Sequence, residues 1–201
     1  MKRGKEIKKF IEYLATGKRP DTFEECYAAT DGVNGFYPQE AKAIWDIIRE
    51  DGKVEFMAEI GRNRGGGLFT LCCAATNLKF VRSVDIAAIP GIDEALADWL
   101  QANKIGHNLQ ICDSRDAKPE LQYDFVYIDG EHTGEGVKAD INNWREHTRL
   151  LGFHDFANRG SKNKHKRVFK DVVREISYAA NLHGWPSIGI RGRSEIVYRV
   201  K

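Results

Sequence analysis

The sequence is organised around one run, Val54-Glu55-Phe56-Met57-Ala58-Glu59-Ile60-Gly61-Arg62-Asn63-Arg64-Gly65-Gly66-Gly67. An apolar run at residues 68–78 follows it, so the order predicts a strand, a tight turn and the start of a helix. Glycine is needed where the backbone takes a positive φ or where a ligand approaches it closely. Free N–H groups at a helix start favour anionic or electron-rich ligand groups. An ordinary strand-to-helix loop has the same pattern, so both interpretations stay open at this point.

Two known nucleotide-binding loops do not fit this run. A P-loop needs Lys and then Ser or Thr after its last glycine, whereas Gly67 and Leu68 follow Gly66 here. The dinucleotide fingerprint needs three glycines, and Asn63 occupies the position of the middle one, which disfavours a nicotinamide-dependent dehydrogenase. The remaining pattern, E-x-G-x-x-x-G-G from Glu59 to Gly66, resembles the nucleotide-binding loop of class I S-adenosylmethionine (SAM)-dependent methyltransferases.

Composition is typical of a globular protein of one domain. The 201 residues are 42% hydrophobic and 30% charged, which allows a sizeable core. The net charge of +2 is too small to indicate nucleic-acid binding by itself. No stretch has the length of a membrane span or the pattern of a signal peptide. The four cysteines lack the spacing of a zinc site, so we expect reduced thiols and a cytoplasmic protein.

The chain divides into a helical start and an alternating remainder. We expect residues 1–50 to form an N-terminal helical cap segment and residues 51–201 to form a SAM-binding Rossmann-like domain, within one compact domain overall. Predicted helices of the first part lie at 1–18, 23–30 and 39–50. Predicted strands lie at 54–60, 80–86, 108–112, 125–129, 150–156, 187–190 and 195–200. Predicted helices between them lie at 66–77, 92–103, 134–148 and 164–183.

This alternation predicts the fold class. Strands separated by helices of this length imply right-handed crossovers and a parallel sheet with helices on both faces. The crossover at 113–123 is too short and polar for a full helix. Only Arg191-Gly192-Arg193 separates the last two strands, so they must form an antiparallel hairpin. The predicted fold is a doubly wound α/β domain with a mostly parallel seven-stranded sheet, and this architecture also resembles the class I methyltransferases.

An acidic residue lies at or near the end of each of the first five predicted strands. In open α/β sheets, ligands bind outside the carboxyl ends of the strands, at the switch point of the topology. A carboxylate at Asp85 can accept hydrogen bonds from both hydroxyls of a ribose, and Asp113 with Ser114 can bond an adenine amino group. A single acid in such a place is more often the cap of the next helix. The whole set favours a binding site; it comprises Glu59, Asp85, Asp113, Asp129 and Asp155.

The segments after the fourth and fifth strands strengthen the resemblance, which covers about residues 39–201. Ile128-Asp129-Gly130-Glu131-His132 and His154-Asp155 are similar to the I-D-G-x-H and H-D segments of a methyltransferase subgroup, small-molecule O-methyltransferases among them. The resemblance implies that the cofactor SAM is held by Glu59, Gly61, Asn63, Gly65, Gly66, Asp85, Ile86, Asp113, Ser114 and Asp129. It further implies that Asp129, His132, His154 and Asp155 face the methyl group and its acceptor. The expected reaction is methyl transfer to a small-molecule acceptor, at a hydroxyl oxygen.

A hydroxyl acceptor must lose its proton, and histidine can remove it because its unperturbed pKa is about 6.5. His154 directly precedes Asp155, and alternation along a regular strand sends adjacent side chains to opposite faces. We therefore expect His132 to act with Asp155 on the acceptor, and His154 to be a core or supporting residue. The family usually has an L-x-P-G-G turn before this strand. The chain has Leu150-Leu151-Gly152 instead, which leaves the register of His154 and Asp155 open.

A divalent metal is an alternative way to orient and acidify the acceptor, because related methyltransferases use one. Asp129 and Asp155 offer oxygen ligands of the kind that a magnesium-type ion prefers. Two carboxylates are few ligands, so metal dependence is the less favoured expectation.

Residues 158–170 are strongly basic and follow the fifth strand, where the acceptor should bind. A solvated loop and helix start is the simplest interpretation; the functional one is a segment that attracts an anionic acceptor. The segment lacks the interleaved aromatic residues of a single-strand platform, so a methyltransferase acting on nucleic acid is an alternative that we do not favour. A SAM-binding domain without catalysis is the alternative from another class of protein.

Overall fold

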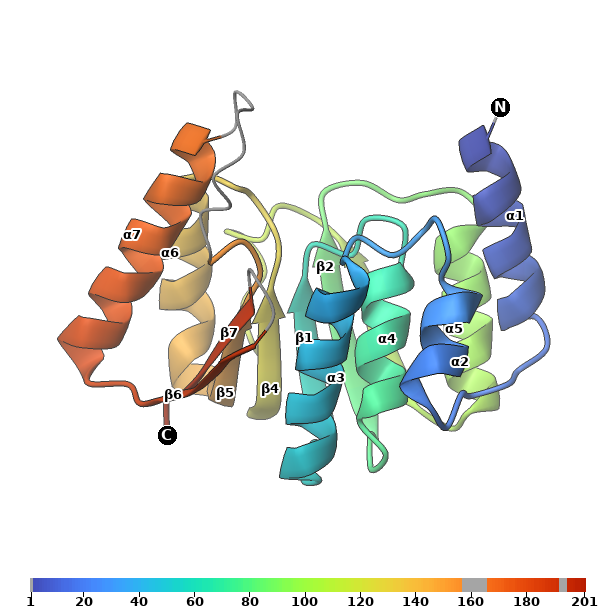
Figure 1. Ribbon diagram of the computed structural model, residues 1–201, viewed down its shortest axis with the longest axis horizontal. Coiled ribbons are helices and arrows are strands. Elements are labelled where there is room, and N and C mark those ends of the chain that lie inside the picture. The colour runs from blue at the N-terminus through green and yellow to red at the C-terminus, as the bar shows by residue number, and fades with distance from the viewer. Residues whose placement is uncertain (1, 157–165, 192–194) are drawn as a thin grey trace.

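The computed structural model describes residues 2–156, 166–191 and 195–201, and its central element is one seven-stranded sheet (Figure 1). The strands are β1 (Phe56–Ile60), β2 (Phe80–Asp85), β3 (Gly106–Ile111), β4 (Tyr123–Ile128), β5 (Thr148–Phe153), β6 (Ser187–Arg191) and β7 (Glu195–Arg199). Their order in the sheet is β3-β2-β1-β4-β5-β7-β6. Strands β1 to β5 run parallel, and β7 is antiparallel to both β5 and β6. The predicted mostly parallel sheet with a C-terminal antiparallel hairpin is confirmed.

The helices follow the predicted alternation, most of them with shorter ends, whereas the helix predicted at 39–50 is one residue longer at each end. They are α1 (Lys2–Leu14), α2 (Phe23–Ala29), α3 (Pro38–Asp51), α4 (Gly66–Ala74), α5 (Ile92–Ala102), α6 (Gly134–Trp144) and α7 (Lys166–His183). The predicted helix at 66–77 ends three residues early, and the one predicted at 134–148 ends in a 3-10 turn, η1 (Arg145–His147). Residues 113–122 form turns rather than a helix, as predicted. Within the described ranges, no helix is both long and apolar enough to cross a membrane.

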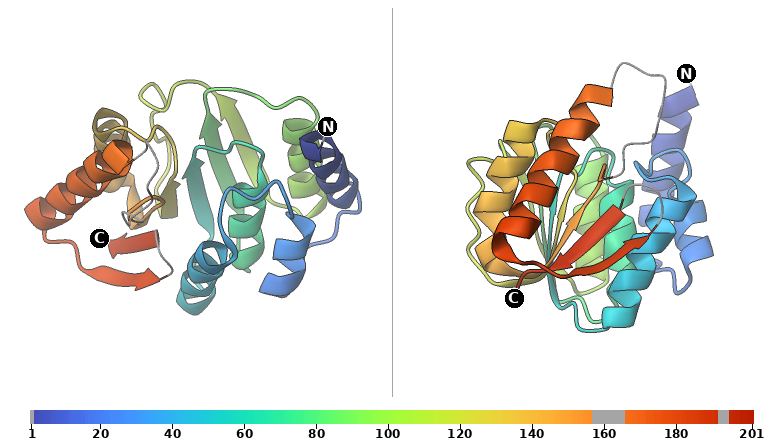
Figure 2. Two further views of the ribbon diagram at one scale, coloured as in Figure 1. Left: turned by 45° about the horizontal axis from the view of Figure 1, so that its top comes forward. Right: turned by 60° about the vertical axis from the view of Figure 1, so that its left-hand side comes forward.

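The sheet carries a separate hydrophobic core on each face, because side chains alternate along every strand. Met57, Phe125 and Tyr127 belong to the core that α1 to α5 cover. Ala58 and Val126, their neighbours in sequence, belong to the core that α6 and α7 cover. Figure 2 shows this three-layer arrangement, with α6 and α7 on one side of the strands and α3, α4 and α5 on the other. The doubly wound arrangement predicted from the alternation of strands and helices is therefore confirmed.

The N-terminal helices share the first of these cores. Phe10 of α1 packs edge-on against Phe69 of α4, with ring centroids 5.5 Å apart, and Phe69 contacts Trp99 of α5 at 4.7 Å. The indole N–H of Trp99 donates a hydrogen bond to the backbone oxygen of Lys18 at 2.8 Å. These contacts bury apolar surface from α1, α4 and α5 together, and they anchor the residues before the first strand to the sheet layer.

The topological switch point lies between β1 and β4. The chain leaves β1 for α4 on one face of the sheet and leaves β4 for α6 on the other, so the two loops separate at this point. Gly61, the residue after β1, has φ +96°, and a Cβ there would lie 2.0 Å from the backbone oxygen of Asp129. Glycine is required at this position, because any side chain would push the two loops apart.

Candidate functional site

A cavity of about 490 Å³ lies at the carboxyl ends of β1 to β4, on both sides of the switch point. The parallel strands direct their following loops to the same edge of the sheet, which brings residues far apart in sequence into one wall. The predicted cofactor residues that line the cavity are Gly61, Asn63, Asp85, Ile86, Asp113, Ser114 and Asp129. His132, predicted for the acceptor, also lines it. The structure therefore brings most of the predicted set into one space.

Three predicted cofactor residues lie outside the wall of this cavity. Glu59 is 2% exposed and accepts a hydrogen bond from the Ser83 hydroxyl at 2.9 Å. Burial raises the pKa of Glu59 to about 8, although the Ser83 hydroxyl and the positive charge of Arg62 act in the opposite direction. Gly65 takes φ +76° as the N-cap of α4, and Gly66 is the first residue of that helix. Glu59 is thus buried within β1, Gly65 and Gly66 form the start of α4, and none of the three lines the cavity.

Arg62 holds the glycine-rich loop and was not predicted. Its buried guanidinium pairs with Asp93 of α5 through two hydrogen bonds, Nε to Oδ1 at 3.0 Å and Nη2 to Oδ2 at 2.8 Å. Nη1 also donates to the backbone oxygen of Ser83 at 3.2 Å. An arginine between glycines is typical of an exposed loop, and no sequence signal identifies a partner 31 residues away. The ion pair fixes the loop against β2 and α5.

Asp85 occupies the position at the end of β2 that was predicted to bind a ribose. Its Oδ2 accepts a hydrogen bond from the backbone N–H of Asn63 at 2.7 Å, and its Oδ1 accepts one from Ala87 at 3.0 Å. Each carboxylate oxygen can accept a further bond, so the group can still receive two hydroxyls. The backbone contacts hold the carboxylate in place at the cavity wall.

The predicted adenine side contains an ion pair at the rim of the cavity. Asp113 accepts bonds from the side chain of Arg115 at 2.8 and 2.5 Å and from its backbone N–H at 2.9 Å. The hydrogen bonds from Arg115 lower the pKa of Asp113 to about 2, so this acid is ionised at neutral pH. Arg115 also lines the cavity, and the sequence reasoning missed it because it looks like any basic loop residue. Ser114 lies beside the pair on the same wall.

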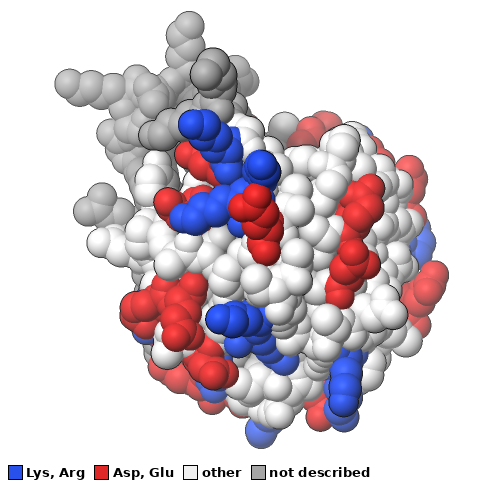
Figure 3. All heavy atoms as spheres, turned by 90° about the vertical axis from the view of Figure 1, so that its right-hand side faces the viewer, with Lys and Arg blue, Asp and Glu red and all other residues white. Residues whose placement is uncertain are grey.

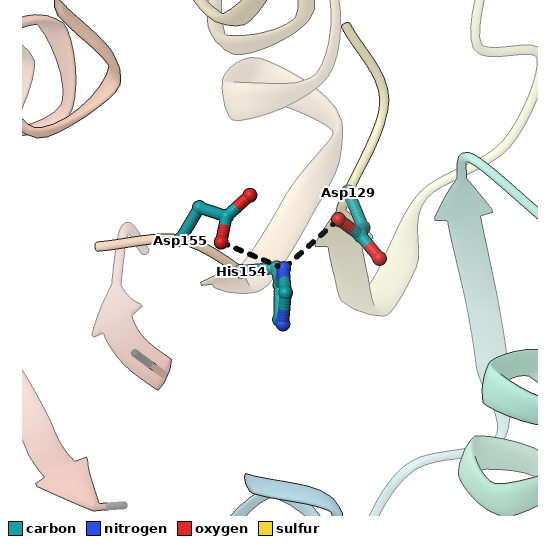
Figure 4. A group of neighbouring side chains, drawn as sticks. All are labelled: Asp129, His154 and Asp155. Atoms are coloured by element: carbon teal, nitrogen blue, oxygen red, sulfur yellow. Dashed lines mark ion pairs between the residues drawn. The ribbon is translucent and has the colours of Figure 1, made fainter. Parts of the chain in front are cut away.

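The four residues predicted for the reacting end come together after β4 and β5. Nδ1 of His132 lies 2.7 Å from Oδ2 of Asp155. Nδ1 of His154 lies 3.1 Å from Oδ1 of Asp129 and 3.3 Å from Oδ1 of Asp155, so its ring stands between two carboxylates (Figure 4). His132 is half exposed, at 51%, whereas His154 is 14% exposed. Asp155 therefore contacts both histidines, one with each oxygen.

The expectation that His154 and Asp155 point to opposite faces is wrong. It assumed that the strand continues through both residues, but β5 ends at Phe153. Asp155 then takes a left-handed conformation, with φ +61°, which turns its side chain back toward His154. A non-glycine residue in this conformation carries strain that surrounding contacts must offset, and here two histidines bond its carboxylate. Strand alternation does not apply past the end of the strand.

These contacts shift the protonation of the reacting end. Burial raises the pKa of Asp155, but hydrogen bonds from His132 and His154 outweigh it and bring this pKa down to about 2. The hydrogen bond that His132 donates to Asp155 raises the pKa of His132 above its usual value, and partial burial opposes this shift. The pair is thus a basic imidazole held by an ionised carboxylate, the arrangement that makes histidine a proton acceptor.

The same group of side chains has the form of a divalent metal site. Ligand atoms of Asp129, His154 and Asp155 all lie within 4.8 Å of one another. Two carboxylates and one imidazole suit a divalent cation that leaves other positions to water or an acceptor oxygen. Asp129 and Asp155 are the two oxygen ligands considered for the less favoured metal alternative, and His154 is a third ligand atom that the sequence did not indicate. The donor set fits such an ion.

The basic segment 158–170 falls largely outside the described residues, as do the side chains at 166–169. Lys170, in α7, is exposed. The prediction that this segment attracts an anionic acceptor stays a prediction. Figure 3 shows one face of the molecule, on which acidic and basic side chains of the described residues are interspersed. Among the described side chains of that face, acidic residues interrupt the basic ones, which form no continuous basic patch there.

Comparison with known proteins gives a consistent picture. Residues 58–156 match the family model described as a methyltransferase domain. A Staphylococcus aureus protein assigned as a caffeoyl-CoA O-methyltransferase has a similar structure, with TM-score 0.67, 14% identity, and coverage of 94% of this chain and 98% of that one. No curated protein sequence matches the chain.

Two further solved structures with the same fold contain S-adenosylhomocysteine (SAH). One is the Podospora anserina methyltransferase PaMTH1, with TM-score 0.64, 12% identity, and coverage of 94% of this chain and 93% of that one. The other is an O-methyltransferase from Bacillus cereus, with TM-score 0.59, 15% identity, and coverage of 94% and 96%. At these identities the likeness shows a shared fold.

Proposed function

We propose that this chain, whose residues 58–156 match a methyltransferase domain and whose fold is that of known O-methyltransferases, transfers a methyl group from SAM to a hydroxyl oxygen of a small molecule. One observation carries the proposal: the cofactor cavity and the His132–Asp155 pair meet at the carboxyl edge of one sheet. Asp129 and His132 line the cavity, so the reacting side chains adjoin the space for the cofactor. Similar structures in complex with SAH support the cofactor assignment.

The cavity wall supplies a contact for each part of the cofactor. Asp85 would accept bonds from the ribose hydroxyls, and Ser114 with the Asp113–Arg115 pair would border the adenine. Gly61 and Asn63, on the loop after β1, would border the methionine end. The negative charge of Asp129 suits a cofactor that carries a positive sulfonium.

The residues at the reacting end would orient the acceptor and remove its proton. When bound, SAM supplies an electrophilic methyl group. The acceptor oxygen forms a bond to that carbon as the carbon–sulfur bond breaks, and the acceptor proton must leave. His132 bonds Asp155 through Nδ1, so Nε2 is the nitrogen that would take this proton. Asp155 holds the ring in place and stabilises its positive charge afterwards.

A metal-assisted form of the same reaction is a second candidate, because Asp129, His154 and Asp155 could hold a divalent cation. A bound cation would acidify the acceptor hydroxyl and reduce the need for a base. Both forms use Asp155, but only the first uses Nε2 of His132. The loss of activity with EDTA, and its return with magnesium or manganese, would identify the second form.

The test begins with the cofactor and ends with the acceptor. Calorimetry should show SAH binding, and NAD should bind more weakly or not at all. Purified protein with SAM and a panel of phenols, catechols, hydroxy acids and phosphorylated sugars should form SAH and a methylated product in the presence of one acceptor class. SAH binding without any methylated product would favour a SAM-binding domain. Product on RNA or DNA alone would favour the nucleic-acid alternative.

The four free cysteines support a reducing compartment, and we propose a cytoplasmic location on that ground.

A further inference from the structure

The segment Phe36–Glu40 lies before the matched methyltransferase domain, yet it reaches the reacting end. Glu40 is the third residue of α3 and is only 1% exposed. Its Oε2 accepts a hydrogen bond from the backbone N–H of Tyr37 at 2.9 Å, which caps the start of the helix. The same oxygen lies 3.7 Å from Nε2 of His154. An N-terminal residue thus faces a histidine that follows β5.

His154 is consequently held from three directions. Its Nδ1 faces Asp129 and Asp155, and its Nε2 faces Glu40. The ring of Phe36 covers the imidazole, with centroids 5.5 Å apart and the planes tilted by 37°. Phe36 is itself buried and packs edge-on against Tyr127 of β4. This packing leaves the imidazole little room to move.

Helix capping alone does not explain the burial of Glu40. Glu94 of α5 has the same capping role, since its Oε2 accepts a hydrogen bond from the backbone N–H of Gly91 at 2.8 Å. Glu94 is nevertheless exposed. A buried carboxylate loses its hydration and must be compensated by donors or positive charge. The Nε2 edge of the His154 ring provides such compensation for Glu40. Glu94 is exposed to water and needs no such partner.

We propose that Glu40 is a positioning residue, which fixes the orientation of the His154 ring so that Nδ1 faces Asp129 and Asp155. Rotation of an imidazole by half a turn about its last side-chain torsion replaces Nδ1 by a carbon, and that torsion is intrinsically soft. A carboxylate near Nε2 favours the ring orientation that places this nitrogen, rather than a ring carbon, toward it, and the other nitrogen then faces Asp129 and Asp155. Through Glu40, the N-terminal segment becomes part of the reacting site.

This inference rests on the proposed function, because the orientation of His154 matters for the reaction only if the site transfers a methyl group. Its test does not depend on turnover, so the two can fail separately. The protein is labelled with ¹⁵N-histidine, and long-range ¹H–¹⁵N spectra of the six histidines are recorded at one pH, with and without SAH. The variant His154→Gln identifies the signals of His154.

The decisive comparison is between Glu40→Gln and Glu94→Gln. Glutamine keeps the capping bond in both helices, because its carbonyl oxygen can accept it, but removes the charge. We expect Glu40→Gln to shift the signals of both ring nitrogens of His154 well beyond the line width. Glu94→Gln should leave these signals unchanged. SAH affinity should stay within about twofold in both variants, since neither residue lines the cavity.

A second variant guards against misfolding. Glu40→Asp keeps the charge but withdraws the carboxylate by one methylene, so it should shift the His154 signals in the same direction by a smaller amount. If Glu40→Gln does not fold, Glu40→Asp decides the question. Unchanged His154 signals in the folded Glu40 variants would overturn the inference. Equal shifts in Glu40→Gln and Glu94→Gln would also overturn it, because they would show a general effect of the lost charge.

Discussion

The cofactor end and the reacting end of the site are held by different kinds of contact. At the cofactor end, Asp85 is held by backbone N–H groups of the neighbouring loops. At the reacting end, Asp155 is held by two imidazoles, and His154 lies among three carboxylates. Backbone donors keep their character at any ordinary pH, whereas the contacts of the reacting end depend on which groups carry protons.

The difference has a consequence for mutation. A side chain removed from the cofactor end leaves the loop backbone in place, so the loss is confined to one set of ligand contacts. Removing a side chain from the reacting end changes the charge and hydrogen bonding of several neighbours, and double substitutions there should be strongly non-additive. Cofactor affinity, turnover and stability, measured on the same variants, distinguish the contribution of the cofactor end from that of the reacting end.

The largest effect is expected from His132→Ala. If His132 is the general base, kcat on the acceptor should fall by about 10²–10⁴. SAH affinity should change little, because the backbone-held cofactor contacts remain. The measurement is steady-state turnover at saturating SAM, combined with calorimetry of SAH binding. His107→Ala, on β3 and away from the cavity lining, is the matched control.

The metal alternative gives a different result for the same variant. If a cation acidifies the acceptor, His132→Ala should retain most activity, and EDTA should abolish activity in both the wild type and the variant. Activity that survives both His132→Ala and EDTA would mean that positioning alone suffices, and the assignment of a base would be wrong.

The next effect concerns the arginine beneath the cofactor loop. Asp93→Ala leaves the buried guanidinium of Arg62 without its bidentate partner, and breaking a buried ion pair costs about 3–5 kcal/mol. Asp93 keeps some solvent contact, so we expect about 3 kcal/mol less free energy of unfolding in urea. SAH should also bind more weakly, because the loop loses its anchor. Asp98→Ala, exposed on the same helix, should change neither quantity.

Asp85→Ala tests the cofactor end directly. Loss of hydrogen bonds from two ribose hydroxyls to a charged group should weaken SAH binding by about 1.5–3 kcal/mol. Turnover at saturating SAM should approach that of the wild type, since the reacting end is unchanged. Calorimetry and steady-state kinetics measure the two quantities. Normal SAH affinity in this variant would remove Asp85 from the ribose site.

The cofactor end was largely predictable because its geometry follows from local sequence. Each acid follows a strand, the parallel strands end at one edge, and a glycine marks the turn after β1. Seven of the predicted cofactor residues consequently line the cavity. Glu59 is buried and does not line the cavity, because the last residues of a strand alternate between loop-facing and core-facing positions and the sequence alone does not fix which of them reaches the cavity. Arg62 and Arg115 were missed because their partners are set by tertiary structure.

The reacting end was only partly predictable, since it depends on two features without a sequence signal. One is the end of β5 at Phe153, which is followed by the left-handed conformation of Asp155. The other is Glu40, which lies 114 positions before His154 and reads as an ordinary helix cap. Strand periodicity and capping rules describe each segment correctly and still miss the contact between them.

The smallest effect is the pH dependence of stability that the His132–Asp155 pair contributes. The folded pKa of Asp155 is lowered from 3.8 to about 2, so its contribution is present above pH 3.8 and is lost as the pH falls toward 2. The folded pKa of His132 is raised above 6.5, so its contribution is complete below pH 6.5 and is lost as the pH rises through the folded pKa. The pair should stabilise the fold most between about pH 4 and 6.5.

The measurement is the difference in free energy of unfolding between the wild type and His132→Gln across pH 3 to 9. Because His132 is half exposed, solvent screens the pair, and the largest difference should stay below about 1 kcal/mol. The difference should shrink on both sides of the window, and salt should reduce it. A difference that is constant with pH would mean that His132 and Asp155 do not interact as an ion pair, and the contrast between the two ends of the site would then lose its electrostatic basis.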